Sequence, residues 1–297
     1  MKLGLQVSRF AWTGAPATTG ATWRRIAQNA DRAGLASLWV MDHLFQISMM
    51  GPPEDDMLEG YTALAHAAAV TEQIELGTLV TGVTYRHPGV LLKTVTTLDV
   101  LSGGRAWLGI GAAWYEEEHR GLGIPYPSTR DRFELLEDTL QLAHRMFADD
   151  DRAFQGRQVS LERPLNHPQP VRRPPIMVGG GGERKTLRLV AQYADACNLF
   201  DTGLGPEGIP HKLEVLRGHC DAVGRDYGDI SKTCLAALTL DTGASLPDGV
   251  RPHTVDQAVE RLGRLAEAGI DHVILSSANP TDEAVYPLLA EVVRQVA

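Results

Sequence analysis

The 297-residue sequence predicts an α/β fold, a single-domain (β/α)8 TIM barrel with insertions that spans residues 1–297. Two observations support this prediction. Strand-like apolar runs alternate with helix-like patterns along the whole chain, and the length suits one large barrel. An open doubly wound sheet is the alternative, because it has the same alternation of elements.

Eight strand-like runs, rich in apolar and β-branched residues, occur in order along the chain. They cover residues 2–7, 37–41, 74–81, 105–111, 176–178, 194–199, 231–240 and 272–276. Helix-like patterns follow them at residues 22–33, 88–101, 133–146, 187–191, 206–223, 254–268 and 282–296. In such a barrel the active site lies at the carboxyl ends of the strands, so functional residues are expected directly after each run.

The helix patterns rest on apolar spacing and on helix-start signals. Residues 22–33 place Trp23, Ile26 and Ala30 on one face, and Pro88 opens a helix where its missing N–H is harmless. One segment, residues 149–175, interrupts the alternation of elements. It alternates apolar and polar residues and then becomes proline-rich, which predicts an inserted hairpin followed by an extended return.

Charge and cysteine content narrow the class of protein. The formal net charge is -9, which argues against a nucleic-acid partner, because binding phosphates requires a basic face. Cys197, Cys220 and Cys234 are widely spaced and lack metal-type spacing, so no metal site is predicted and reduced thiols are expected. Without a signal peptide or a membrane-length apolar run, we expect a cytoplasmic protein with no membrane partner.

Three strand ends carry candidate functional residues. Asp42-His43 follows the second run and is an acid–base candidate, although a structural His beside a capping Asp is the simpler interpretation. Gly82, directly after the third run and within a β-branched stretch, indicates a bulge with close approach of another molecule or, equally, a simple bend. The fourth run ends like a dinucleotide fingerprint, but Trp114 stands at the third glycine position, so a flat-ring pocket or tight packing is expected instead.

The four glycines Gly179, Gly180, Gly181 and Gly182 follow the fifth run and precede a helix pattern. Free N–H groups at a helix start bind anions, and Arg184 lies nearby, so anion binding is favoured over a plain turn. The run Glu116-Glu117-Glu118 is interpreted as a solvated first helical turn. The Met-rich loop from Leu44 to Tyr61 is either an adaptable substrate wall or a lid without a role in specificity.

Taken together, the motifs resemble the luciferase-like monooxygenase superfamily, and its branch that uses the deazaflavin coenzyme F420 most of all. The resemblance covers nearly the whole chain in order. It rests on Asp42-His43, the run from Leu76 to Pro88, the run from Thr97 to Arg105, Gly109-Ile110-Gly111-Ala112, and the four glycines.

The resemblance implies a cofactor site at the strand ends. The edges of the ring would contact Asp42 and His43 on one side and Ile110, Gly111 and Ala112 on the other. A bulge that contains a non-proline cis peptide in relatives would back the ring with Val80, Thr81 and Gly82. The cofactor phosphate would lie on the glycine run beside Arg184.

The resemblance also implies an oxidoreductase that moves a hydride between F420 and a small organic substrate, with His43 as the catalytic proton donor or acceptor. An FMN-dependent monooxygenase that uses O2 and a non-catalytic cofactor-binding protein are the alternatives. Sugar-phosphate dehydrogenases of the F420 branch carry a Glu where Ala112 stands here, so that particular activity is not expected. Relatives are often dimers, which makes a homodimer one expected oligomeric state.

Overall fold

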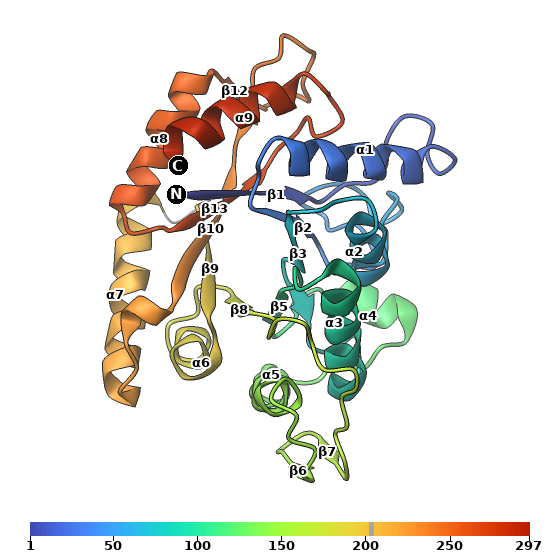
Figure 1. Ribbon diagram of the computed structural model, residues 1–297, viewed down its shortest axis with the longest axis vertical. Helices are drawn as coiled ribbons and strands as arrows, with labels where there is room; N and C mark the ends of the chain where they lie inside the picture. Colours follow the sequence, from blue (N-terminus) through green and yellow to red (C-terminus); the bar gives the residue numbers. More distant parts are fainter. Residues whose placement is uncertain (202–204) are drawn as a thin grey trace.

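The chain forms a parallel barrel surrounded by helices (Figure 1). The computed structural model describes residues 1–201 and 205–297. The sheet order is β3-β2-β1-β13-β10-β9-β8-β5-β4. Its strands are β1 (Lys2–Val7), β2 (Ser37–Val40), β3 (Glu75–Thr78), β4 (Thr81–Gly82), β5 (Leu108–Gly111), β8 (Ile176–Gly179), β9 (Ala196–Phe200), β10 (Ser231–Ala237) and β13 (His272–Ser276).

The two ends of the sheet, β3 and β4, are parts of one predicted strand, and this closes the barrel. β3 pairs with β2 and β4 pairs with β5, and Leu76 in β3 also bridges to Ala106 just before β5. Residues Leu79 and Val80 separate the two parts. The predicted eight-stranded (β/α)8 barrel is therefore confirmed, and the open doubly wound sheet is wrong.

Helices follow the strands and cover the outside of the barrel, as Figure 1 shows. They are α1 (Thr19–Arg32), α2 (Gly60–Ala68), α3 (Pro88–Ser102), α4 (Glu116–Leu122), α5 (Thr129–Met146), α6 (Thr186–Tyr193), α7 (Gly205–Val223), α8 (Val255–Glu267) and α9 (Val285–Val296). The sequence patterns missed α2 because its outer face is poor in polar residues. Tyr61, Ala63, Leu64 and Ala67 are buried, but one exposed position is Ala65, so the polar contrast that would reveal a helical period is weak.

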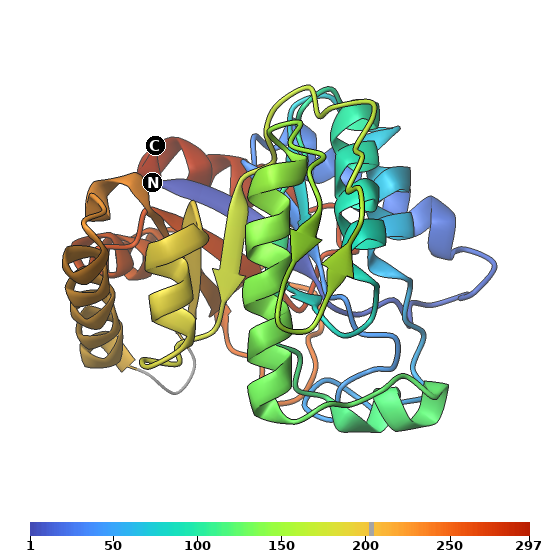
Figure 2. The same cartoon turned by 90° about the horizontal axis from the view of Figure 1, so that it is seen from below.

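Two short strand pairs lie outside the barrel. Between α5 and β8, β6 (Phe154–Gln155) and β7 (Ser160–Leu161) pair in the antiparallel sense. After β10, β11 (Thr239–Leu240) pairs with β12 (Pro252–His253), so the predicted strand 231–240 is in fact two separate strands. Figure 2 shows β6 and β7 alongside α5, and α4 at the end of the barrel where the loops drawn in blue lie.

The barrel interior is a packed apolar core, and it forms the base on which the candidate site rests. Trp39 and Trp107 meet inside it edge to face, with ring centres 5.8 Å apart. Gly77 makes room for them, because a Cβ there would come within 2.4 Å of the Trp39 ring. Val80 and Leu235 pack on this interior cluster. Side chains at the strand ends therefore stand on a rigid floor.

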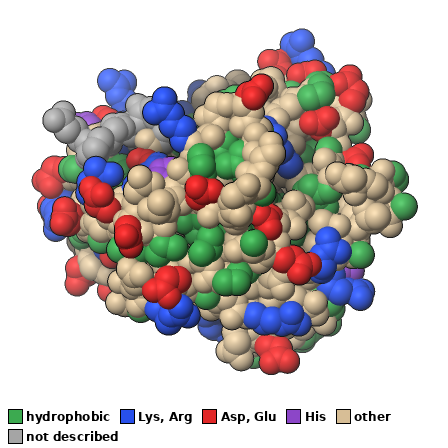
Figure 3. All heavy atoms as spheres, turned by 90° about the horizontal axis from the view of Figure 1, so that it is seen from above, with side chains coloured by type: hydrophobic (Ala, Val, Ile, Leu, Met, Phe, Trp, Pro, Cys, Tyr) green, Lys and Arg blue, Asp and Glu red, His purple; other side chains and the backbone are tan. Residues whose placement is uncertain are grey.

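The two chain ends are joined by a hydrogen bond, and the surface in Figure 3 carries mixed charges. The Met1 amino group donates a hydrogen bond to the Val296 carbonyl at 2.6 Å, and the two ends lie together in Figure 1. No helix of the described chain combines the length and the apolar character that crossing a membrane requires. On the face drawn in Figure 3, acidic and basic side chains are mixed, without a continuous basic patch among the atoms that are coloured by type.

Candidate active site

A cavity of about 690 Å³ lies at the carboxyl ends of the barrel strands. Strands from all around the barrel contribute to it, through Gln6 of β1, His43 after β2, Gly111 of β5, Asn198 of β9 and Ser276 of β13. This is where a barrel of this kind carries its active site. The cavity is large enough for a flat cofactor ring together with a small substrate.

Most of the predicted site residues line this cavity. They are Asp42, His43, Val80, Thr81, Gly82, Gly111, Ala112, Gly179 and Gly180. Ile110 instead packs in the apolar core between strands and helices, with no exposed surface. Gly181, Gly182 and Arg184 continue the chain beyond the lining residue Gly180, and Arg184 is exposed.

Val80 stands at the centre of the cavity floor. The peptide bond between Leu79 and Val80 is cis, as the family resemblance implies, and the Leu79 carbonyl accepts a hydrogen bond from Gln6 Nε2 at 3.3 Å. The Val80 methyl groups fit between two glycines. A Cβ at Gly111 would come within 3.0 Å of them, and one at Gly179 within 2.9 Å. Because these two positions are glycines, the Val80 side chain can lie between the ends of β5 and β8.

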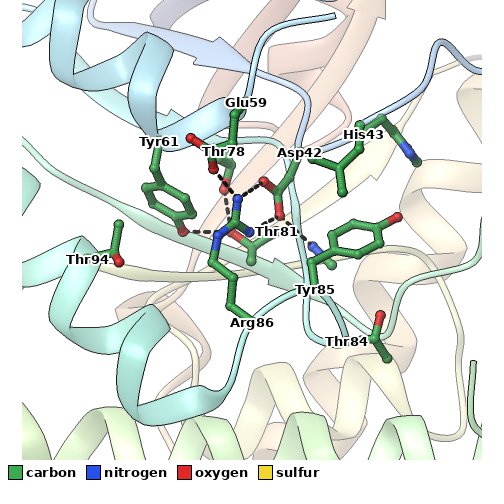
Figure 4. A network of polar contacts seen from close by, with 12 residues as sticks. Asp42, His43, Glu59, Tyr61, Thr78, Thr81, Thr84, Tyr85, Arg86 and Thr94 are labelled. Carbon is green, nitrogen blue, oxygen red and sulfur yellow. Dashed lines mark hydrogen bonds and ion pairs between the residues drawn. The ribbon is translucent and has the colours of Figure 1, made fainter. Parts of the chain in front are cut away.

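Asp42 is held by Arg86 and not by its sequence neighbour His43. Each Asp42 carboxylate oxygen accepts a hydrogen bond from Arg86 at 2.8 Å, and Oδ2 also accepts one from the Gly82 N–H at 3.2 Å. Arg86 also donates to Glu59. Figure 4 shows the Asp42 carboxylate directed at this guanidinium, with His43 on the other side. Burial raises the pKa of Asp42 to about 6, although the hydrogen bonds and charge of Arg86 oppose this effect.

The partner of His43 is Glu118, in the first turn of α4. His43 Nδ1 lies 2.7 Å from Glu118 Oε1, and the Glu118 side chain has no exposed surface. The predicted solvated turn is therefore right for Glu116 and Glu117, which are exposed, and wrong for Glu118. A carboxylate only accepts hydrogen bonds, so Nδ1 carries the hydrogen and Nε2 is left for the cavity.

Glu118 is fully occupied by protein donors. Besides His43, its oxygens accept hydrogen bonds from the Tyr85 hydroxyl, from Leu44 N at 2.7 Å and from Phe45 N at 3.2 Å. Burial alone would raise the pKa of Glu118, but hydrogen bonds from His43 and Tyr85 outweigh it and hold that pKa below its usual value. Glu118 is thus a buried anion that fixes the His43 ring and the start of the following loop.

Tyr85 explains the glycine at position 82. A Cβ on Gly82 would lie 2.4 Å from the Tyr85 ring, so the close approach predicted here comes from the chain itself. The same ring lines the cavity and stacks at 4.7 Å from His119. Burial, followed by the hydrogen bond to Glu118, raises the pKa of Tyr85 far above its usual value. Tyr85 therefore stays a neutral donor to Glu118.

The glycine run forms the opposite end of the cavity. Gly180 has a φ of +110°, which only glycine adopts without strain. A Cβ at Gly181 would meet nothing closer than Leu199 and Lys212, both at 3.9 Å. Within residues 1–201 and 205–297, neither Gly181 nor Gly182 donates its N–H to a protein acceptor. The run therefore offers free donors and open space at the start of α6.

Three residues at the site were not predicted. Tyr85 and Arg132 line the cavity, and Glu118 lies behind His43 without lining it. The only sequence cue to Glu118 is its place soon after the fourth strand, where a glutamate is equally well explained by the helix dipole. The apolar wall was partly foreseen, because Met49 and Met50 of the Met-rich loop do line the cavity.

Comparison with known proteins agrees with this geometry. The family model described as luciferase-like monooxygenase matches residues 1–245. The chain belongs to the luciferase-like monooxygenase family. The family expected from the sequence motifs is thereby confirmed.

The F420-dependent glucose-6-phosphate dehydrogenase of Kineococcus radiotolerans is 30% identical to this luciferase-like chain over 220 residues. The match covers 72% of the chain but 63% of that enzyme, so the chain spans less than two thirds of the relative's length.

Solved structures share the fold of this luciferase-like protein. An F420-dependent secondary alcohol dehydrogenase in complex with an F420-acetone adduct has a TM-score of 0.82 at 17% identity, covering 100% of this chain and 99% of that one. Monooxygenase RslO1 from Streptomyces bottropensis has a TM-score of 0.79 at 20% identity, covering 98% of each chain. At these identities the likeness shows a shared barrel fold.

Proposed function

We propose that this chain is a coenzyme F420-dependent oxidoreductase that transfers a hydride between the deazaflavin and a small organic substrate. One observation carries the proposal: a single cavity joins an anion-binding glycine run at one end to a His held by a buried Glu at the other. When bound, the coenzyme supplies or accepts the hydride, and the protein supplies binding, orientation and a proton.

The residues present fit such a coenzyme. Val80 between Gly111 and Gly179 offers a flat apolar floor for a ring, because a Cβ on either glycine would collide with it. The free N–H groups of Gly181 and Gly182 suit a phosphate at the start of a helix. Lys185 and the predicted Arg184 follow directly in the chain and are exposed, so they add positive charge beside these donors.

His43 is the group that we assign to proton transfer. Its Nδ1–H is held by Glu118, and the ring lines the cavity, so Nε2 is the nitrogen available to a substrate. In the protonated ring Nε2 donates a proton to a substrate oxygen, and in the neutral ring it accepts one from an alcohol. The hydrogen bond from Nδ1–H to the buried Glu118 carboxylate keeps the orientation of the ring fixed.

Two alternatives remain distinct from this proposal. An FMN-dependent monooxygenase would use the same barrel and phosphate site, and the fold likeness to RslO1 is compatible with it. A non-catalytic cofactor-binding protein would use them as well. The curated relatives named F420-dependent glucose-6-phosphate dehydrogenase favour F420 over FMN.

Equilibrium binding with both cofactors tests the proposal. Isothermal titration of the purified protein with F420 and then with FMN should give a lower Kd for F420. Tight FMN binding without measurable F420 affinity would replace the proposal with the monooxygenase. F420 binding without reduction of any tested acceptor would favour the non-catalytic protein.

The remaining predictions concern the setting of the protein. Cys197, Cys220 and Cys234 are unpaired and buried, which suits the predicted cytoplasmic location. The predicted homodimer is measured by light scattering coupled to size-exclusion chromatography. A small-molecule substrate, without nucleic acid or membrane as partner, is part of the proposal.

A further inference from the structure

The charges in the cavity are few, and this restricts what it can bind. Of the described residues that line it, only Asp42, His43 and Arg132 carry an acidic or basic side chain, and Arg132 is the one Lys or Arg among them. Asp42 is already neutralised by Arg86. Recognition of an anionic substrate in this cavity would therefore depend on Arg132 and His43.

The Arg132 guanidinium donates hydrogen bonds to three protein acceptors. Its Nε donates to the Ala112 carbonyl at 3.1 Å, and its terminal nitrogens donate to the Pro127 carbonyl at 2.6 Å and to Thr129 Oγ1 at 3.4 Å. Its guanidinium also lies 4.2 Å from the centre of the Tyr126 ring, and the residue is only 8% exposed. Three of its five N–H groups are thus directed at protein acceptors, one in the loop after β5 and two around the start of α5.

The surroundings of His43 disfavour an anion. The carboxylate of Glu118 lies directly behind the ring, at 2.7 Å from Nδ1. A substrate phosphate placed at Nε2 would face this buried negative charge across a single imidazole. A sugar phosphate would bring about two negative charges to this place, where Glu118 already contributes one.

The wall around His43 is apolar. Ile47, Met49 and Met50 line the cavity from the loop after β2, which also carries His43. Trp114 adds an aromatic edge, with its ring centre 5.4 Å from that of His43. Sugar hydroxyls buried against these side chains would lose their hydrogen bonds to water without replacement.

The opposite end of the cavity has the positive charge. Lys185 lies with its ammonium 5.0 Å from the centre of the Phe133 ring, and Arg184 is exposed beside it in the chain, whereas the Lys212 ammonium is paired with Glu183. An anionic group is therefore favoured at the glycine run and an uncharged group at His43. This division matches a coenzyme phosphate at one end and the substrate at the other.

We infer that the substrate is an uncharged, largely apolar ketone, or the secondary alcohol related to it, and not a sugar phosphate. The inference rests on the proposed function. In the reduction, the carbonyl carbon gains the hydride of reduced F420 and the oxygen gains the His43 proton. The C=O π bond is replaced by one C–H and one O–H bond, so the ketone is reduced and the coenzyme oxidised. The reverse applies to the alcohol.

The test compares two classes of ligand on the F420-loaded protein. Cyclohexanone and acetophenone with reduced F420, and cyclohexanol with oxidised F420, represent the apolar class. Glucose and glucose 6-phosphate with oxidised F420 represent the sugars. Turnover is followed by the absorbance of oxidised F420, and isothermal titration into the loaded protein measures binding without turnover. Saturable binding and turnover are expected for at least one apolar ligand and for neither sugar.

A matched pair of variants locates the binding site. Met50→Arg places a cation in the apolar wall, and Ser48→Arg places the same charge on an exposed neighbour outside the lining. Burial of part of the Met50 side chain against a ketone should contribute about 1.4 kcal/mol to binding. Because Met50→Arg removes this contribution, it should raise the Kd of the ketone by about tenfold. Ser48→Arg should leave the Kd of the ketone unchanged. Equal effects in both variants would refute the assignment of this wall.

The experimental outcomes distinguish failure of the proposed function from failure of the inferred substrate class. Absence of F420 binding refutes the proposed function itself. F420 binding together with saturable binding or turnover of glucose 6-phosphate overturns the substrate class alone. F420 binding with no response to any of the three apolar ligands also overturns it.

Discussion

Replacing Glu118 by Gln tests whether a buried carboxylate controls His43. The substitution keeps the shape of the side chain and removes its charge. Glu118 accepts four hydrogen bonds, from His43, Tyr85, Leu44 and Phe45. An amide has one oxygen in place of two. In either orientation of the Gln side chain, its NH2 group therefore faces two of these four donors, which lose their acceptor.

The magnitude follows from this count. Two of the four hydrogen bonds are lost, and each hydrogen bond to a charged group contributes about 1.5–3 kcal/mol, so the variant should lose about 3 kcal/mol or more of stability. For a chain of this size, such a loss lowers Tm by about 5 °C or more. The His43 ring also loses the carboxylate that holds its Nδ1–H, so turnover should fall by about 100-fold, within the usual range of acid–base contributions.

The assay measures Tm by calorimetry, the Kd of F420 by titration and kcat with the ketone found in the substrate panel. The Kd of F420 should change little, because the glycine run lies at the other end of the cavity. Glu116→Gln is the matched control, since Glu116 lies in the same turn but is exposed and pairs only with Arg120. Glu118→Asp, which keeps the charge, should recover part of kcat.

A folded Glu118→Gln variant with the kcat of the wild type would refute the reasoning. The pH dependence gives a second check. Because the folded pKa of Glu118 is depressed, its stabilisation is present above about pH 4.5 and is lost as pH falls through the folded value. The Tm values of wild type and variant should therefore converge at low pH. A constant difference down to about pH 2 would contradict the ionised-carboxylate assignment.

Three further predictions follow from the same structure. His43→Ala should lower kcat by about 10²–10⁴-fold with a smaller effect on the Kd of F420, and a loss confined to that Kd would make His43 a ring contact only. Gly181→Val should weaken F420 binding about ten- to hundredfold at unchanged Tm, whereas Gly180 is unsuitable for this test because of its positive φ. His272 is buried beside Ser37, and burial lowers its pKa from 6.5 to about 4. The contribution of neutral His272 to the free energy of unfolding is therefore complete above pH 6.5 and is lost as pH falls toward 4. This loss is about 3 kcal/mol, and calorimetry of His272→Gln should show a flatter Tm in that window.

The barrel could be predicted because its strands are buried on both faces and therefore read as continuous apolar runs. The same reasoning did not resolve the third strand, which breaks at Leu79 and Val80 into β3 and β4. Nothing in an apolar run marks where its backbone leaves the sheet. It also missed α2, whose exposed face includes Ala65 and therefore differs little in polarity from its buried face. A helix with few polar residues on its outer face thus escapes detection by periodicity.

Site residues could be predicted from the sequence only where a short run of neighbouring residues carries the signal. The glycine run and the strand-end His43 lie in the sequence as local patterns, and most of the predicted residues line the cavity. The pairing of polar groups was not predictable. His43 was expected beside Asp42, but its carboxylate partner lies 75 residues away, and Asp42 pairs with Arg86, 44 residues away. Such pairs are fixed by the closure of the barrel and not by sequence proximity.

The position of the carboxylate decides how the acid–base work is divided. The family resemblance associates a Glu at the Ala112 position with sugar-phosphate chemistry, where it works together with the His. Here Ala112 is part of the cavity wall, and the carboxylate of Glu118 approaches His43 from behind, at Nδ1. All of its hydrogen bonds come from the protein and none of its surface is exposed, so it has no atom with which to touch a substrate. Glu118 is therefore a positioning residue, and His43 alone carries the proton.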